Sequence, residues 1–169
     1  VLKRDGVCYS KEEYVRKKYK ESAKVFINAY GWFVKEAQHI VPKPEGAEYP
    51  YWAFTDLYNV DQTGDGHVLT LDVPIGEAIL FDMFDWTKIM QMHYIGENES
   101  EEATFSEELK NMGMNEFQIM TSNFYPEQKA RIQESWKRLF GHQQAIEAGD
   151  NSGVHSVQAG LKDEWIVKE

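Results

Sequence analysis

The sequence lacks the features that would place it in a specialised structural class. A single cysteine, Cys8, among 169 residues excludes an internal disulfide and suits a reducing cytoplasm. No apolar run approaches the roughly 18 residues of a membrane span, and the first residues contain no signal-peptide core. Gly-rich phosphate-binding loops of the Walker or Rossmann type are also absent. We therefore expect a cytoplasmic protein with no membrane segment and no bound cofactor.

Positive charge is scarce as well. Lysine and arginine number 18 against 28 aspartates and glutamates, which gives a formal net charge of −10 and a pI near 5.0. A negative balance of this size repels nucleic-acid backbones and argues against broad binding to DNA or RNA. The densest basic run, residues 16–18, lies among acidic residues and is predicted to be a solvated helix face.

Apolar and aromatic residues, in contrast, are plentiful. Hydrophobic residues make up 42% of the chain and aromatic residues 14%. This composition predicts a packed core rather than disorder. The length fits a single domain over residues 1–169.

Helical periodicity and end signals predict helices over about residues 11–19, 26–40, 86–94 and 126–140. A further surface helix is predicted from the acidic stretch of residues 97–108, and it should end at Gly113. Ser10 and Glu13 fit a capping box at the start of the first helix. Gly31 weakens the second helix and suggests that another element packs closely there. Ser100 is the expected cap of the acidic fourth helix. His93 shares a face with apolar residues and is expected to be a hydrogen-bonded core histidine.

Short apolar bursts between turn residues predict strands over residues 51–57, 68–73, 78–81, 154–159 and 165–167. Residues 114–120 fit either a strand or a helix. Several short strands among helices, without strict alternation, predict an α+β fold. We expect a small twisted sheet, mixed or antiparallel, packed by three to four helices.

Residues 61–72 match the twelve-residue calcium loop at several ligand positions, with Asp72 in place of the usual glutamate. Two features oppose a calcium site: Leu69 occupies a ligand position, and the alternation of residues 68–73 leads into a strand instead of a helix. A Gly-rich turn between two strands is the preferred interpretation, and no metal site is predicted.

A candidate ligand site combines aromatic, acidic and amide side chains. Its predicted residues are Tyr51, Trp52, Asp82, Asp85, Trp86 and Gln158. The two aspartates beside Trp86 form either an acid pair under an aromatic wall or a helix cap, and capping is the preferred interpretation. Tyr51 and Trp52 are expected on opposite faces of one strand. Gln158 is a polar residue in an apolar strand, and no nucleophile motif identifies a catalytic residue.

Six stretches together resemble a known family. They are AYGW at residues 29–32, EYPYWAF at 48–54, LTLDVP at 69–74, LFDMFDW at 80–86, SWKRLF at 135–140 and VQA at 157–159. In order and spacing they resemble a bacterial family known only as domain of unknown function 3841. The resemblance therefore implies a type of domain and no activity.

A more distant similarity concerns the layout of strands. The late Gln-Ala strand and the following Trp165 look like ADP-ribosyltransferase-type folds, in which a glutamate on a late strand binds the nicotinamide ribose. Gly160 stands where that glutamate is expected, and fold analogy alone does not establish function. We expect a non-catalytic module that binds a small molecule or a protein partner. The alternative is an ADP-ribosyltransferase-like enzyme that binds NAD or a related nucleotide.

Overall fold

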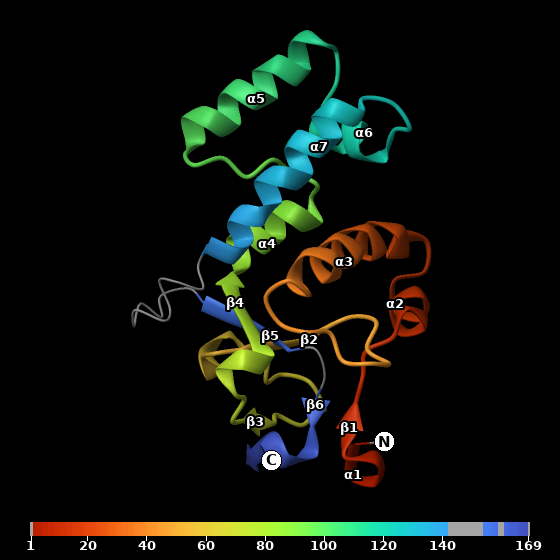
Figure 1. Cartoon of the computed structure of the whole chain (residues 1–169), viewed down its shortest axis with the longest axis vertical. Helices are drawn as coiled ribbons and strands as arrows, with labels where there is room; N and C mark the ends of the chain where they lie inside the picture. Colours follow the sequence, from red (N-terminus) through yellow and green to blue (C-terminus); the bar gives the residue numbers. More distant parts are fainter. Residues whose placement is uncertain (1, 142–153, 159–160, 169) are drawn as a thin grey trace. The chain divides into compact units, whose positions relative to one another are not determined.

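The computed structural model describes residues 2–141, 154–158 and 161–168 (Figure 1). Its backbone divides into two compact units. The first unit contains Val1–Leu80 and Asn151–Glu169, and the second contains Phe81–Asp150. The fold is α+β, as predicted, whereas a single domain over residues 1–169 stays a prediction. None of the helices in the described ranges has the length and apolar character of a membrane-spanning helix.

The helices of the first unit precede most of its strands. They are α1 (Leu2–Asp5), α2 (Glu12–Tyr19) and α3 (Ala23–Ala37), with 3-10 turns η1 (Lys20–Ser22), η2 (Leu57–Asn59), η3 (Ile75–Glu77) and η5 (Asp163–Trp165). Ala29, Phe33 and Ala37 lie on the buried stripe of α3, as the periodicity predicted. Gly31 lies on the exposed side, and a Cβ there would meet no atom within 4 Å. The expected close packing at Gly31 is therefore wrong.

The start of α2 differs from the predicted capping box. Ser10 forms a β-bridge with Tyr49, and no side-chain cap comes from the preceding residue, Lys11. The backbone N–H of Glu12 instead donates to Oε2 of Glu48 at 2.8 Å. A carboxylate suits this position because the amino end of a helix presents free donors and partial positive charge. The predicted capping box is wrong because a residue distant in sequence supplies the acceptor.

Among the described residues, the strands form three small sheets. They are β1 (Val7–Cys8), β2 (Tyr51–Phe54), β3 (Thr70–Leu71), β4 (Ala78–Asp82), β5 (Val154–Gln158), β6 (Leu161–Lys162) and β7 (Ile166–Lys168). The sheet orders are β1-β6, β2-β5-β4 and β3-β7. Strands β1 and β6, β2 and β5, and β3 and β7 pair antiparallel. Three predicted strands are shorter than expected: residues 51–57 form a strand only to Phe54, residues 68–73 only at Thr70–Leu71, and Trp165 belongs to a turn.

Beyond the end of β4, the described residues of the second unit are mainly helical. Its elements are α4 (Met83–Met90), α5 (Glu99–Asn111), α6 (Glu116–Thr121), α7 (Pro126–Ser135) and the 3-10 segment η4 (Trp136–Gly141). Figure 1 shows α6 beside α7, and these two helices pack together. The core of the unit includes Phe105, Leu109, Ile119, Ile132 and Leu139. Residues 114–120, which fitted either element, belong mainly to a helix that begins with a capping box of Asn115 and Gln118.

Two predicted helix ends in this unit are wrong. Asn98, not Ser100, caps α5 and accepts from the backbone N–H of Glu101 at 3.0 Å. Helix α4 ends at Met90, and Met92 takes a positive φ of 62°, which turns the chain out of the helix. His93 consequently lies beyond the helix with 52% of its side chain exposed, and its Nδ1 is 3.0 Å from Oε2 of Glu116. The expected core histidine is wrong for this reason.

Side chains hold the segment between α4 and α5. Four consecutive backbone N–H groups, those of Tyr94, Ile95, Gly96 and Glu97, donate to side chains of Glu116, Ser135, Glu102 and Glu101 respectively. Glycine is required at position 96, because a Cβ there would lie 2.9 Å from the carbonyl oxygen of Asn98. Irregular backbone needs such partners, since a buried donor without an acceptor costs about 1–3 kcal/mol.

Candidate functional site

Three of the predicted site residues belong to the first unit. The hydroxyl of Tyr51 lies 2.9 Å from Sγ of Cys8, and its burial, together with the Cys8 contact, raises the pKa of Tyr51. Trp52 packs on α3, with its ring centroid 5.6 Å from Tyr30 and 6.0 Å from Phe33. The neighbouring side chains thus contact different elements. Gln158 lies opposite Tyr51 in the β2–β5 ladder.

The other three predicted residues belong to the second unit. Asp82 Oδ1 accepts from the backbone N–H of Phe84 at 2.6 Å, so Asp82 is the N-cap of α4. Asp85 lies in the first turn of that helix. Trp86 is buried, with its ring 6.2 Å from that of Phe81. The capping interpretation is confirmed for Asp82, and a ligand site made of all six predicted residues stays a prediction.

The loop that resembles a calcium site leads into a strand. Oδ1 of Asp61 accepts from both the backbone N–H and the hydroxyl of Thr63, and these bonds lower the pKa of Asp61. The loop continues into β3, and the N–H of Asp72 donates to the carbonyl of Trp165 at 2.8 Å. Across the described ranges, no three His, Cys, Asp or Glu side chains are placed to hold a metal ion. The geometry supports the turn interpretation.

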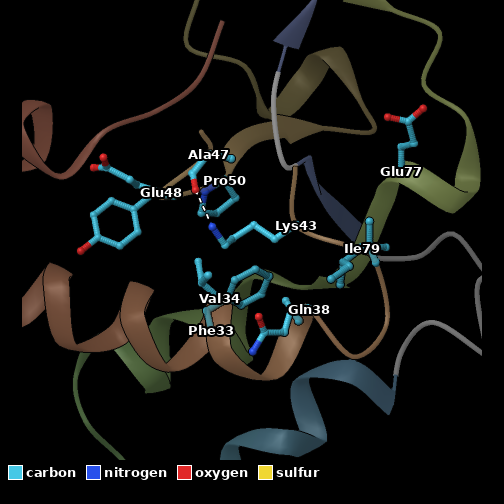
Figure 2. Close-up of a pocket in the computed structure, with 12 residues that line it drawn as sticks. Phe33, Val34, Gln38, Lys43, Ala47, Glu48, Pro50, Glu77 and Ile79 are labelled. Atoms are coloured by element: carbon cyan, nitrogen blue, oxygen red, sulfur yellow. Dashed lines mark hydrogen bonds between the residues drawn. The ribbon is translucent and has the colours of Figure 1, made fainter. Parts of the chain in front are cut away.

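A small apolar pocket of the first unit is a candidate site (Figure 2). It forms because the chain folds back after α3: the N–H groups of Ile40 and Val41 both donate to the carbonyl of Ala37 at 2.9 Å. The following segment then covers the last turns of the helix. The apolar lining consists of Phe33, Val34, Ala37, Val41, Ala47, Tyr49, Pro50 and Ile79. The polar lining consists of Gln38, Lys43, Glu48 and Glu77.

The pocket is small and its walls are firmly packed. It encloses a volume of about 40 Å³. Phe33, Ala47 and Ile79 are each less than 5% exposed. The hydroxyl of Tyr49 donates to Glu12 at 3.0 Å and holds the ring in place. Burial is the main cause that raises the pKa of Tyr49 to about 12, and the hydrogen bond to Glu12 contributes to the same shift. Such packing limits the occupant to a short apolar group.

The polar side chains around the pocket differ in their partners. Figure 2 shows the stem of Lys43 lying between α3 and Pro50, and its Nζ donates to the carbonyl of Ala47 at 2.8 Å. Oε1 of Glu48 is 3.4 Å from Nζ of Lys11. The backbone bond from Glu12 is the main cause that lowers the pKa of Glu48. Oε2 of Glu77 is 2.6 Å from Nζ of Lys162.

A wider groove of about 490 Å³ adjoins the pocket and shares Val41 and Glu77 with it. Its other lining residues are Val7, Tyr9, Pro42, Pro44, Gly76, Lys162 and Trp165. Nζ of Lys162 lies 4.8 Å from the ring centroid of Trp165. The pocket with this groove therefore offers an apolar inner part and a more open, partly charged outer part.

The sequence did not predict this site. Neither the pocket nor the groove is lined by Tyr51, Trp52, Asp82, Asp85 or Trp86. One local signal was present: three prolines and Gly46 within residues 42–50 indicate a stiff returning segment after the helix. Nothing local, however, indicates that this segment folds onto α3, because the contacts join residues far apart in sequence.

The profile of one protein family, described as Domain of unknown function (DUF3841), matches residues 1–167. No curated protein and no solved structure matches the chain. The expected similarity to ADP-ribosyltransferase-type folds thus has no support among solved structures and stays a prediction. The position of the missing ribose-binding glutamate, Gly160, lies outside the described residues.

Proposed function

We propose that this chain, which belongs to the DUF3841 family, is a non-catalytic binding module whose pocket takes a short apolar group of a small ligand. One observation supports this proposal: apolar side chains of α3, of the segment 41–50 and of β4 surround a preformed pocket with polar groups at its edge. Small-molecule sites typically combine an apolar lining with a few placed polar groups.

The chemistry of the lining supports a binding role over a catalytic one. General acid–base or nucleophilic catalysis needs an activated group facing the reactants. The two carboxylates at the pocket are engaged by Lys11 and Lys162, and neither histidine nor cysteine appears among the lining residues described. A cytoplasmic location belongs to the same proposal, because the only cysteine, Cys8, is a free thiol.

The size of the pocket narrows the class of ligand. A buried water needs about 10–15 Å³ of cavity volume, so a pocket of about 40 Å³ takes the first few carbons of an alkyl chain and leaves the rest of the ligand outside it. A nucleotide such as NAD is much larger than this pocket. A short alkyl chain fits, with the polar end of the ligand at the edge of the pocket, where the polar lining residues lie.

Titration with 1-hexanol, followed by methyl NMR, tests the proposal. The expected result is a saturable shift of the methyl signals of Ala37, Ala47 and Ile79, which line the pocket. Ala37→Leu fills the pocket and should abolish the shifts in Ala47 and Ile79. Asn28→Leu adds a leucine at an exposed position of the same helix and should leave them unchanged.

Thermal unfolding of each variant verifies that it is folded, because overpacking at a buried position costs about 1–3 kcal/mol. The proposal is wrong if hexanol shifts no pocket methyl, or if Ala37→Leu leaves the shifts of a folded protein intact. NAD is titrated in parallel. A saturable response to NAD, without one to hexanol, would favour the transferase alternative.

A further inference from the structure

The charges around the pocket do not cancel. Glu48 has Lys11 as its partner, and Glu77 is paired with Lys162. Lys43 donates to a neutral carbonyl, that of Ala47. Within the part of the chain that the structure describes, no carboxylate oxygen lies within 4.0 Å of Nζ of Lys43. Lys43 acts on Glu48 only at longer range, where its charge contributes to lowering the pKa of Glu48. The pocket therefore carries one positive charge that forms no ion pair with a described carboxylate.

The ammonium group of Lys43 is also positioned to contact a ligand in the pocket. Its ammonium group has three N–H donors, and the bond to Ala47 occupies one of them. That bond holds Nζ beside the pocket, while the stem lies between α3 and Pro50 (Figure 2). A ligand at the edge of the pocket can accept a second hydrogen bond without displacing the first. Such preorganisation reduces the cost of ordering the lysine when a ligand binds.

We propose that the ligand of this pocket is a short-chain monoanionic acid, the simplest form being an aliphatic carboxylate. Its apolar chain enters the pocket and its carboxylate accepts from Nζ of Lys43. This inference rests on the proposed function, to which it adds the charge of the ligand. A cationic ligand is disfavoured, because the two acidic side chains of the lining already have lysine partners.

The net negative charge of the protein means that an anionic ligand needs a local positive contact to bind. A net charge of −10 repels anions at long range. Anion selectivity therefore has to come from a short-range contact, and Lys43 is the lining residue that provides it. Hydrogen bonds between an ammonium group and a carboxylate are stronger than those between neutral groups.

Hexanoate and 1-hexanol form a matched pair of probes, because they have the same chain length and differ in charge at neutral pH. Both are titrated against the full chain and followed at the methyl signals of Ala47 and Ile79. Lys43→Met removes the charge and keeps the apolar stem. It should weaken hexanoate about fivefold and change hexanol by less than about twofold, as expected for a partly exposed ion pair.

Two controls isolate the role of Lys43. Lys43→Arg keeps the charge and should retain most of the affinity for hexanoate. Lys35→Met removes an exposed lysine of α3 that does not line the pocket, and should leave both probes unchanged. Added salt should weaken hexanoate binding and leave hexanol binding nearly constant, because salt screens exposed charges.

The outcomes separate the two proposals. If neither probe shifts the pocket methyls, the proposed function itself is wrong. If hexanol binds and Lys43→Met does not selectively weaken hexanoate, the pocket stands and the inference about charge is overturned. Equal weakening of both probes by Lys43→Met also overturns the inference, because Lys43 then acts only through the shape of the pocket.

Discussion

At a few single residues the backbone adopts a conformation that is unfavourable for a residue with a side chain. Among the described residues, Lys20, Met92 and Tyr125 take a positive φ although they carry side chains. A Cβ is crowded in this region of backbone space, and glycine avoids the crowding. Lys20 follows the end of α2, where its N–H donates to the carbonyl of Arg16. Glycine is common at this kind of helix end.

Lys20→Gly should raise the free energy of unfolding by about 0.5–1 kcal/mol, because relief of backbone crowding exceeds the entropy that glycine loses on folding. The φ of Lys20 is 49°, and its side chain is exposed. Denaturant unfolding measures the change. Lys18→Gly, at an exposed position inside α2, is the control and should instead lower the free energy by about 1 kcal/mol. A loss of stability in both variants would contradict the strain argument.

At the scale of elements, helix starts show where local patterns succeed and where they fail. Asn115 and Gln118 form a capping box within one turn of chain. The cap of α2 comes instead from Glu48, which lies 36 residues beyond Glu12. Apolar periodicity found α3 and α7, because burying one stripe of a helix requires that spacing. Capping is harder to predict, since any nearby acceptor satisfies the free donors.

Asp82 provides a test of capping against ligand contact. Asp82→Ala should lower the free energy of unfolding by about 1 kcal/mol, because the N–H of Phe84 loses its acceptor. Asp82→Asn keeps a capping oxygen and should cost only a few tenths of a kcal/mol. Thermal unfolding compares the two variants. An equal loss in both would mean that the carboxylate charge, not the cap, is what stabilises α4.

For the whole molecule, carboxylates in hydrogen bonds link stability to pH. Bonds from Arg16 and Tyr49 lower the pKa of Glu12, and bonds from Tyr94 and Glu97 lower that of Glu101. The backbone bond from Glu12 does the same for Glu48. A carboxylate whose pKa is lower in the folded than in the unfolded protein stabilises the fold at pH values above its unfolded-state pKa. This stabilisation is lost as the pH falls through its folded-state pKa.

The unfolding temperature should therefore stay nearly constant from neutral pH down to about pH 5. It should decrease at pH values below 4.5, the ordinary pKa of glutamate. Melting curves over this range measure the effect. Glu101→Gln removes one contributing group, so the drop on acidification should be smaller in that variant. A midpoint that rises continuously towards low pH would contradict this account, because relief of repulsion among the acidic groups would then dominate.

The sequence by itself determined the α+β class, the principal helices and most strand positions, because periodicity and turn residues act over a few neighbours. It also indicated a helix cap at Asp82 or Asp85 and the family resemblance. The tertiary structure decided the cap of α2, the exposure of His93 and the pocket. The cap and the pocket depend on contacts between distant residues, such as Glu48 with Glu12 or Ile79 with the lining of α3, whereas the exposure of His93 follows from the turn at Met92. Local patterns do not encode such contacts, since they arise only when the chain packs.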